Sequence, residues 1–313
     1  MTNSALSPFP IIAILGPTAV GKTSVAIRLA KRIRGEIVNL DSVQIYKGLD
    51  IGSAKPTKEE QAEVKHHLID ILEPDEVIDA TIFATKASFA IKNIIKRGKV
   101  PILVGGTGFY LRSIFEGLTP LPSKHPAIRN FLNIYLREKG RDFLYNFLME
   151  VDKEAADKIH KNDTYRLIRA LEVYMSSSIP FSVLCKKERV YIPFRLDNRA
   201  LLKIGLITDR DQLYKRIDDR VEFMVQHGFI DEVKDLLNKG YNPKLKPLQS
   251  IGYRHIISYL LGNKGLADTI DELKRDTRHY AKRQITWFKK EDQIRWFNVE
   301  KLLQSRDIWK EIN

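Results

Sequence analysis

The stretch GPTAVGKTS, residues 16 to 24, decides the fold expected for this chain. It follows the apolar run IIAIL and precedes the helical pattern VAIRLAKRI. A loop of the form G-x-x-x-x-G-K-[ST] between a strand and a helix holds phosphates: its backbone N–H groups point inward, its lysine adds a positive charge, and its hydroxyl can reach Mg²⁺. The motif does not say whether those phosphates belong to a nucleotide.

Apolar runs on both sides of the loop predict a parallel sheet. IIAIL (residues 11–15), GEIVNL (35–40) and VPILV (100–104) are continuous, rich in β-branched residues and bounded by Gly or Pro, which is typical of buried parallel strands. Helical patterns lie between them, over residues 23–34 and 80–98. We therefore expect an α/β fold, a P-loop NTPase-like doubly wound parallel sheet, with its ligand at the carboxyl ends of the strands.

The alternation of strand and helix patterns ends after Gly117. The turn-rich piece LTPLPSKHP leads into mostly helical sequence, and LLKIGLI (residues 201–207) returns the chain to the sheet. We expect residues 1–119 and 200–313 to form the α/β core, including a basic C-terminal part that reads as helical from Asp209. Residues 120–199 are expected to form a helical insertion.

The net charge is +13, from 52 Lys and Arg against 39 Asp and Glu. Such an excess favours a polyanionic partner, nucleic acid before an anionic membrane, although a merely basic surface is the simpler alternative. The single cysteine, Cys185, excludes an internal disulfide and a cysteine-based zinc site. The N-terminus lacks a signal-peptide pattern and the apolar runs are too short to span a bilayer, so we expect a soluble, cytoplasmic protein.

Two strand ends carry candidate chemistry. Asp41, where the second strand stops, could hold a substrate or accept a proton, although a turn or capping aspartate would look the same. Gln44 adds an amide able to read the edge of a base. The third strand ends in GGTG, containing Thr107, where a nucleotide hydrolase would usually carry an Mg²⁺-binding aspartate. The glycines favour close approach of a ligand, or simply a tight turn.

Basic residues recur at helical spacing in the last third. Arg216 and Arg220, four apart, either lie on a solvated surface or neutralise a departing phosphate group. Nearer the C-terminus, a basic ridge interleaved with aromatic residues is typical of a surface that contacts a nucleic-acid backbone, the alternative being core aromatics among solvated charges. The ridge consists of Arg275, Arg278, Lys282 and Arg283.

Several stretches together resemble one family, the tRNA dimethylallyltransferases (tRNA isopentenyltransferases) of the bacterial type. They are GPTAVGKT, LDSVQIYKGLDIGSAKPT, HHLID, GGTGFYLRS, DTYRLIRALEVY, IGYRH and RHYAKRQITWF, in family order from residue 16 to residue 288. The resemblance implies transfer of a dimethylallyl group from dimethylallyl diphosphate to N6 of adenosine 37 in tRNAs that read codons beginning with U. The products would be N6-(dimethylallyl)adenosine and diphosphate.

The resemblance also implies roles for residues. Asp41 would accept the proton, Thr107 would position the reacting centre, Arg220 would stabilise the leaving group, and Thr23 would bind Mg²⁺. The diphosphate would be held by Gly16, Pro17, Thr18, Ala19, Val20, Gly21, Lys22 and Thr23. Contacts to tRNA are expected from Asp41, Ser42, Val43, Gln44, Thr107, Tyr165, Arg166, Leu167, Ile168, Arg169, Arg278, Lys282 and Arg283.

We expect a monomer whose insertion clasps the anticodon stem, with no membrane partner. Many family members have a glutamine at the position of Tyr165, so stacking would replace an amide contact there. Three rival functions stay open: a P-loop kinase for a small molecule, an adenylate (free-nucleotide) isopentenyltransferase, and a non-catalytic RNA-binding module. Only the tRNA transferase accounts for the phosphate loop, the insertion and the basic ridge together.

Overall fold

The computed structural model describes residues 10–187, 192–196 and 200–312. The chain divides into two compact units, one formed by Met1–Phe115 with Pro193–Asn313 and the other by Glu116–Ile192. Sequence analysis places the insertion at 120–199. Residues 188–191 and 197–199 of that stretch, and residues 1–9 of the expected core, lie outside the described residues.

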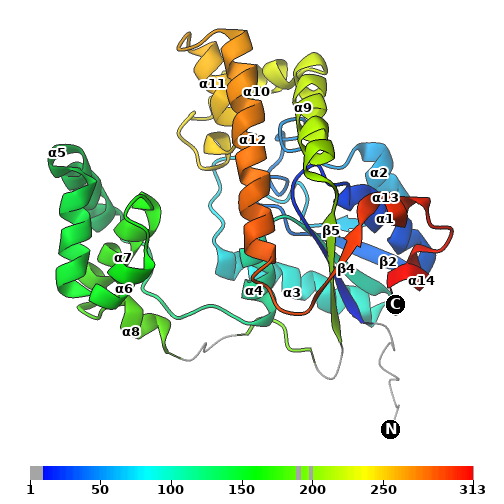
Figure 1. Ribbon diagram of the computed structural model, residues 1–313, viewed down its shortest axis with the longest axis horizontal. Helices are drawn as coiled ribbons and strands as arrows, with labels where there is room; N and C mark the ends of the chain where they lie inside the picture. Colours follow the sequence, from blue (N-terminus) through cyan, green and yellow to red (C-terminus); the bar gives the residue numbers. More distant parts are fainter. Residues whose placement is uncertain (1–9, 188–191, 197–199, 313) are drawn as a thin grey trace. The chain divides into compact units, whose positions relative to one another are not determined.

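The larger unit is built on a parallel sheet of six strands in the order β3-β2-β4-β1-β5-β6 (Figure 1). The expected α/β fold with a parallel sheet is therefore confirmed. The strands are β1 (Ile11–Leu15), β2 (Gly35–Asn39), β3 (His66–His67), β4 (Val100–Gly105), β5 (Leu201–Ile207) and β6 (Ile294–Asn298).

Helices cover both faces of the sheet, as a doubly wound fold requires. Alternate residues of β1 face opposite ways, so Ile12 and Ile14 belong to one core while Ile11 and Leu15 belong to the other. The first core is completed by α1 (Lys22–Ile33), α13 (Val299–Gln304) and α14 (Ile308–Ile312). The second includes α3 (Ala80–Lys96), α4 (Gly108–Phe115) and buried residues of the helices that follow β5, while α2 (Lys58–Glu63) is a short helix with no buried residue.

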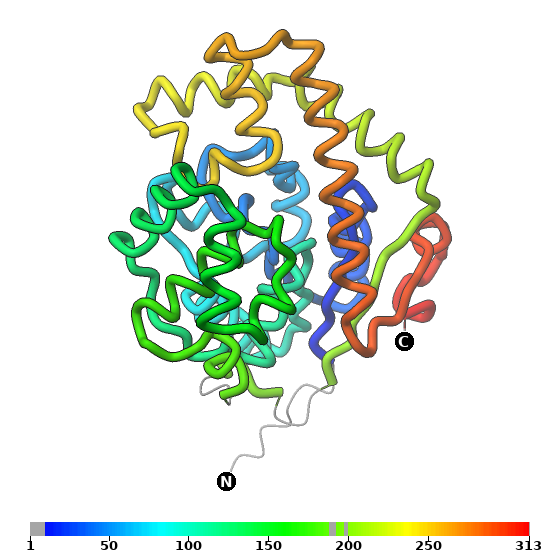
Figure 2. Tube along the Cα trace, turned by 60° about the vertical axis from the view of Figure 1, so that its left-hand side comes forward, coloured from blue at the N-terminus to red at the C-terminus, as the bar shows by residue number. Residues whose placement is uncertain are grey.

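The last third is mostly helical, but the expectation that it is wholly helical is wrong. Residues 294–298, IRWFN, form β6 and pair in parallel with β5. Their β-branched and aromatic side chains suit a strand. The helices before it are α9 (Arg210–Gln226), α10 (Phe229–Asn238), α11 (Tyr253–Leu260) and α12 (Leu266–Phe288), with a 3₁₀ turn at Pro247–Gln249. Figures 1 and 2 show α9, α10 and α11 beyond the carboxyl end of β5, with the long α12 running from there back alongside the sheet toward β6.

The smaller unit is helical and has its own core. It contains α5 (Pro126–Val151), α6 (Lys153–Lys158), α7 (Thr164–Ser177) and α8 (Phe181–Cys185). Leucines from α5 and α7 fill the core, and α5 is interrupted at Gly140, whose φ of 82° leaves the helical region. Within the described part of the chain, no helix combines the length and apolarity needed to cross a membrane.

Candidate active site

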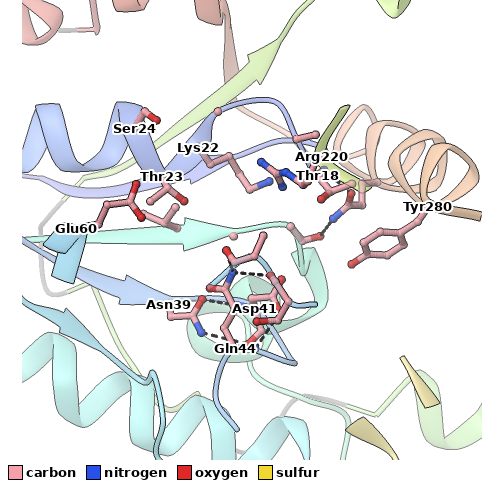
Figure 3. A pocket seen from close by; sticks show the side chains of 18 residues that line it. Thr18, Lys22, Thr23, Ser24, Asn39, Asp41, Gln44, Glu60, Arg220 and Tyr280 are labelled. Atoms are coloured by element: carbon pink, nitrogen blue, oxygen red, sulfur yellow. Dashed lines mark hydrogen bonds between the residues drawn. The ribbon is translucent and has the colours of Figure 1, made fainter. Parts of the chain in front are cut away.

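The strand register brings three loops to one edge of the sheet. Leu15 of β1 pairs with Gly105 of β4, and Asn39 of β2 pairs with Val104. The residues that follow each strand therefore meet around a cavity of about 230 Å³ (Figure 3). Its lining includes Thr18, Ala19, Gly21, Lys22, Thr23, Asn39, Asp41, Gln44, Ser53, Ala54, Glu60, Gly106, Arg220, Tyr280 and Gln284.

The phosphate loop curls around the ammonium group of Lys22. Gly16 and Gly21 have φ values of 146° and 100°, conformations that a side chain would strain. Lys22 Nζ donates hydrogen bonds to the carbonyl oxygens of Gly16 (3.0 Å) and Pro17 (2.6 Å). Burial, followed by the nearby Arg220 charge, lowers the pKa of Lys22 to about 7, and Asp41 offsets only part of this. An anion bound here would therefore be stabilised.

Of the three arginines on α9, Arg210, Arg216 and Arg220, only Arg220 lines the cavity. Burial lowers the pKa of its guanidinium, and no residue in the described ranges hydrogen-bonds or ion-pairs with it. Arg216, one turn earlier, donates to Glu300 Oε1 at 2.7 Å and to the Val20 carbonyl at 3.4 Å. Figure 3 shows Lys22 and Arg220 directed toward one another. Arg220 is thus the arginine of α9 that reaches the cavity beside the phosphate loop.

Asp41 is both a turn residue and a cavity residue, so the two interpretations of the sequence are compatible. Its Oδ1 accepts hydrogen bonds from the backbone N–H groups of Val43 (2.8 Å) and Gln44 (3.3 Å). Asn39 Oδ1 accepts from the Asp41 N–H at 2.9 Å, and Asn39 Nδ2 donates to the Leu68 carbonyl at 3.1 Å. The turn fixes the carboxylate through Oδ1, and no described residue donates to Oδ2.

The Gln44 amide supports the cavity wall. Its Nε2 donates to the carbonyl oxygens of Ser53 (3.1 Å) and Ala54 (3.0 Å), which leaves Oε1 as the part able to meet a ligand. Ser42 and Val43 line a second cavity, of about 390 Å³, that shares Asp41 and Arg220 with the first.

Helix α12 contributes two residues to the cavity: Gln284, which sequence analysis missed, and Tyr280, which it counted only among the aromatic residues of the basic ridge. Gln284 accepts a hydrogen bond from the Thr18 N–H (2.8 Å) and donates to the Gly106 carbonyl (3.1 Å), so it joins the phosphate loop to the end of β4. Burial and the Asp41 charge raise the pKa of Tyr280, whose hydroxyl interacts with Thr107 and Gln284. A signal existed: Tyr280 and Gln284 are four apart and share one face of a helix. Sequence analysis missed Asn39 too, because its position at the end of a strand does not by itself indicate a hydrogen bond to Asp41.

Helix α12 packs directly against the glycines of the GGTG turn, where a side chain would clash with it. A Cβ on Gly106 would lie 2.0 Å from Gln284 Nε2, and one on Gly108 would lie 2.1 Å from Trp287 Nε1. The structure thus shows close approach of α12, and because Gly106 also lines the cavity, the expected close approach of a ligand stays a prediction.

The chain is similar in sequence to known proteins over most of its length. The family model described as IPP transferase matches residues 44–291. The chain is 45% identical over 308 residues to tRNA dimethylallyltransferase 2 of Syntrophus aciditrophicus, covering 97% of both proteins. It is also 45% identical to tRNA dimethylallyltransferase of Desulfitobacterium hafniense, with 93% of this chain and 92% of that protein covered. The chain belongs to the tRNA dimethylallyltransferase family.

Solved structures agree. The tRNA isopentenylpyrophosphate transferase of Bacillus halodurans is 39% identical, with a TM-score of 0.68 over 97% of this chain and 93% of that one. A eukaryotic dimethylallyltransferase solved acting on tRNA is 30% identical, with a TM-score of 0.75 over 95% of this chain and 75% of that one. The family resemblance inferred from the motifs is confirmed.

The residues of α12 and of the smaller unit that were expected to contact tRNA differ in exposure: some are exposed, some are ion-paired and some are buried in a core. Arg278 donates to both carboxylate oxygens of Asp218, at 2.7 and 2.8 Å, whereas Lys282 and Arg283 on the same helix are exposed. In the smaller unit, Tyr165 and Arg166 are exposed.

The remaining three residues of that segment are engaged within the smaller unit. Leu167 and Ile168 are buried in its core, so their side chains do not reach a ligand. Arg169 donates to Glu172 at 2.8 Å and to the Pro122 carbonyl at 2.6 Å, which makes it part of the framework of this unit.

Proposed function

We propose that this chain transfers a dimethylallyl group from dimethylallyl diphosphate to N6 of adenosine 37, in tRNAs that read codons beginning with U. One observation carries the proposal. Lys22 and Arg220, neither ion-paired to a described carboxylate, converge on a phosphate loop whose cavity also contains Asp41. A diphosphate beside a proton acceptor fits prenyl transfer to an amine, and family membership supports this reaction.

The reaction makes one bond and breaks another. The N6 nitrogen of adenine bonds to C1 of the donor, the C1–O bond breaks, and diphosphate leaves with that electron pair. The N6 lone pair is delocalised into the ring, so a base that accepts the N6 proton as the bond forms assists the attack; Asp41 Oδ2 has that role. Lys22 and Arg220 stabilise the charge that builds on the departing diphosphate.

The donor set near the phosphate loop fits Mg²⁺. Thr23 and Glu60 line the cavity with oxygen atoms, and among the described residues no group of three His, Cys, Asp or Glu side chains could hold a metal. This suits Mg²⁺, which usually keeps several waters and binds through one or two protein oxygens plus substrate phosphates. Thr23 would hold the ion with the donor, and the ion would supply charge neutralisation on the diphosphate.

The second cavity suits the acceptor base. Beyond Asp41 it is lined by Val43, the Tyr280 ring and Arg283, so it offers an apolar wall, an aromatic face and a cation. An adenine stacked in the anticodon loop must leave the stack before N6 can reach Asp41. The smaller unit would bind the anticodon stem, with the protein acting as a monomer on tRNA.

A labelled-donor assay tests the proposal. The purified protein is incubated with Mg²⁺, radiolabelled dimethylallyl diphosphate and one of three acceptors: unmodified tRNA containing A36-A37-A38, its A37→G transcript, or AMP. We expect label in the first tRNA only. Label in AMP would instead establish the free-nucleotide transferase. No label in any acceptor, with turnover of ATP to ADP, would establish the kinase.

A further inference from the structure

Glu232, in the first turn of α10, makes an unusual set of contacts outside the cavity. Its Oε2 accepts hydrogen bonds from the backbone N–H groups of Asp50 (3.1 Å) and Ile51 (2.6 Å). Its Oε1 accepts from the Gly52 N–H (3.2 Å) and from the Tyr253 hydroxyl (2.7 Å) on α11. One carboxylate therefore holds three successive amides of one loop, and hydrogen bonds to a charged acceptor are the stronger kind.

The loop held by Glu232 forms part of the active-site wall. Its next two carbonyls, of Ser53 and Ala54, accept the hydrogen bonds from Gln44. Ala54 and Arg220 line three cavities in common, two of them being those described above. Ala54 has a φ of 50°, a conformation that a non-glycine residue keeps only where its surroundings impose it.

The loop packs closely against α10 and α11 at Gly52. A Cβ on Gly52 would lie 2.0 Å from a ring carbon of Phe229 on α10 and 2.8 Å from the ring of Tyr253. Both rings are fully buried, and they meet edge to face with centroids 5.2 Å apart. The loop therefore lies directly against α10 and α11, and the Glu232 hydrogen bonds fix its register along them.

The arginine proposed to act on the diphosphate, Arg220, lies on α9, the helix that precedes α10. Helix α10 follows α9 through Gly228, whose φ is 97°, and α9 carries Arg220. Because no described residue pairs with the guanidinium, its location is set by where α9 lies. We propose that Glu232 is a positioning residue, which locks the α9–α10 pair onto loop 50–54 and so fixes Arg220 relative to the phosphate loop. This inference rests on the proposed function, in which Arg220 stabilises the leaving diphosphate.

Two matched variants test whether Glu232 positions Arg220. Glu232→Gln and Asp231→Asn each remove one negative charge from the first turn of α10, but Asp231 is 76% exposed and pairs only with Lys234 among the described residues. We expect Glu232→Gln to lower kcat by about tenfold or more, since misplacement by about 1 Å can slow a reaction roughly a hundredfold. The KM for tRNA should stay unchanged, and Asp231→Asn should behave as the wild type.

A double-mutant cycle separates positioning from general support. If Glu232 acts through Arg220, then Glu232→Gln adds little to the loss already caused by Arg220→Ala. If Glu232 only supports the fold, the two losses multiply, and that result would overturn the inference.

Amide hydrogen exchange tests, without any activity measurement, whether Glu232 holds the loop at residues 50–52. Exchange at residues 50–52 should become faster in Glu232→Gln and stay unchanged in Asp231→Asn. Tyr253→Phe, which removes one of the four hydrogen bonds and keeps the carboxylate, supplies a milder variant should Glu232→Gln fold poorly; it too should speed this exchange. Unchanged exchange in folded variants would overturn the inference. A wild-type protein that transfers no prenyl group would instead refute the proposed function.

Discussion

Arg216 and Arg220 lie one turn apart on α9 but have different surroundings. Arg220 lines the cavity and Arg216 is paired with Glu300. We therefore expect Arg220→Ala to lower the single-turnover rate by about 10²- to 10³-fold, as losing one group that stabilises developing charge does. Arg216→Ala removes a partly exposed ion pair, worth about 0–1 kcal/mol, and should leave the rate nearly unchanged. The opposite pattern would show that Arg216 contacts the diphosphate.

Lys22 makes donor binding depend on pH. Its pKa of about 7 leaves part of the population neutral in the free protein, and a bound diphosphate favours the charged form. The charged form is present below this pKa and lost above it. Pyrophosphate should therefore bind more weakly as the pH rises from about 6 to about 8, with net proton uptake near neutrality.

Calorimetry in buffers of different ionisation enthalpy measures that uptake. Lys22→Arg is the control, because arginine stays charged throughout this pH range. Protonation of pyrophosphate itself is common to both proteins, so the difference between them reports Lys22. Equal proton uptake in the two proteins would contradict the assignment.

The contact between α12 and the β4–α4 turn is the element on which the site geometry depends most directly. A methyl group at position 108 would lie 2.1 Å from Trp287 Nε1, so Gly108→Ala must displace the turn or the helix. We expect a loss of about 1–3 kcal/mol in the free energy of unfolding, typical of overpacking, and a lower kcat because Gln284 and Tyr280 move with the helix.

Gly265→Ala is the matched control, at the other end of α12. Its φ is −69°, and an added Cβ would meet only Asp268 Oδ2 at an ordinary 3.5 Å. Urea unfolding and kcat should both be close to wild type for this variant. If Gly108→Ala were equally harmless, the close contact would not govern the site.

An element can be predicted from sequence when the residues that specify it are close together in the chain. It cannot when its formation depends on residues far away in the chain. The strands β1, β2 and β4 and the phosphate loop are specified by residues adjacent in sequence, namely a β-branched run bounded by glycine. Strand β6 is five residues long and follows a long helix, and its place in the sheet comes only from pairing with β5. The sequence carried the propensity for β6 but no sign of that partner.

For the site residues too, what could be predicted depends on how far apart in the chain the interacting residues are. Asp41 was predictable because it follows a strand, and strand ends meet at one edge of a parallel sheet. The role of Gln284 depends on contacts with Thr18 and Gly106, which are 266 and 178 residues away. Only tertiary packing brings these together, so helical spacing alone could not separate Gln284 from the charged residues around it.

At the scale of the whole molecule, the two units divide the proposed work. The phosphate loop, Asp41 and Arg220 all belong to the larger unit, whereas Tyr165 belongs to the smaller one. Tyr165 is 61% exposed, and the Arg129 guanidinium lies 5.6 Å from its ring centroid. Glu172, fully buried, accepts hydrogen bonds from Arg129 (2.9 Å) and Arg169 (2.8 Å), so this cation is held against the ring. The smaller unit thus presents a supported aromatic side chain to solvent.

This division predicts that the two substrates respond separately to substitution. Tyr165→Ala should weaken tRNA binding by about 1–3 kcal/mol, the usual loss when a base–aromatic stack is removed, while pyrophosphate binding stays unchanged. Tyr165→Phe keeps the ring and should bind tRNA as the wild type does. Fluorescence anisotropy with a labelled anticodon stem-loop, at several salt concentrations, supplies the affinities. The salt dependence should be the same for all three proteins, because no charge is removed. A tRNA affinity unaffected by Tyr165→Ala would mean that the smaller unit contacts the RNA through its basic side chains rather than through this ring.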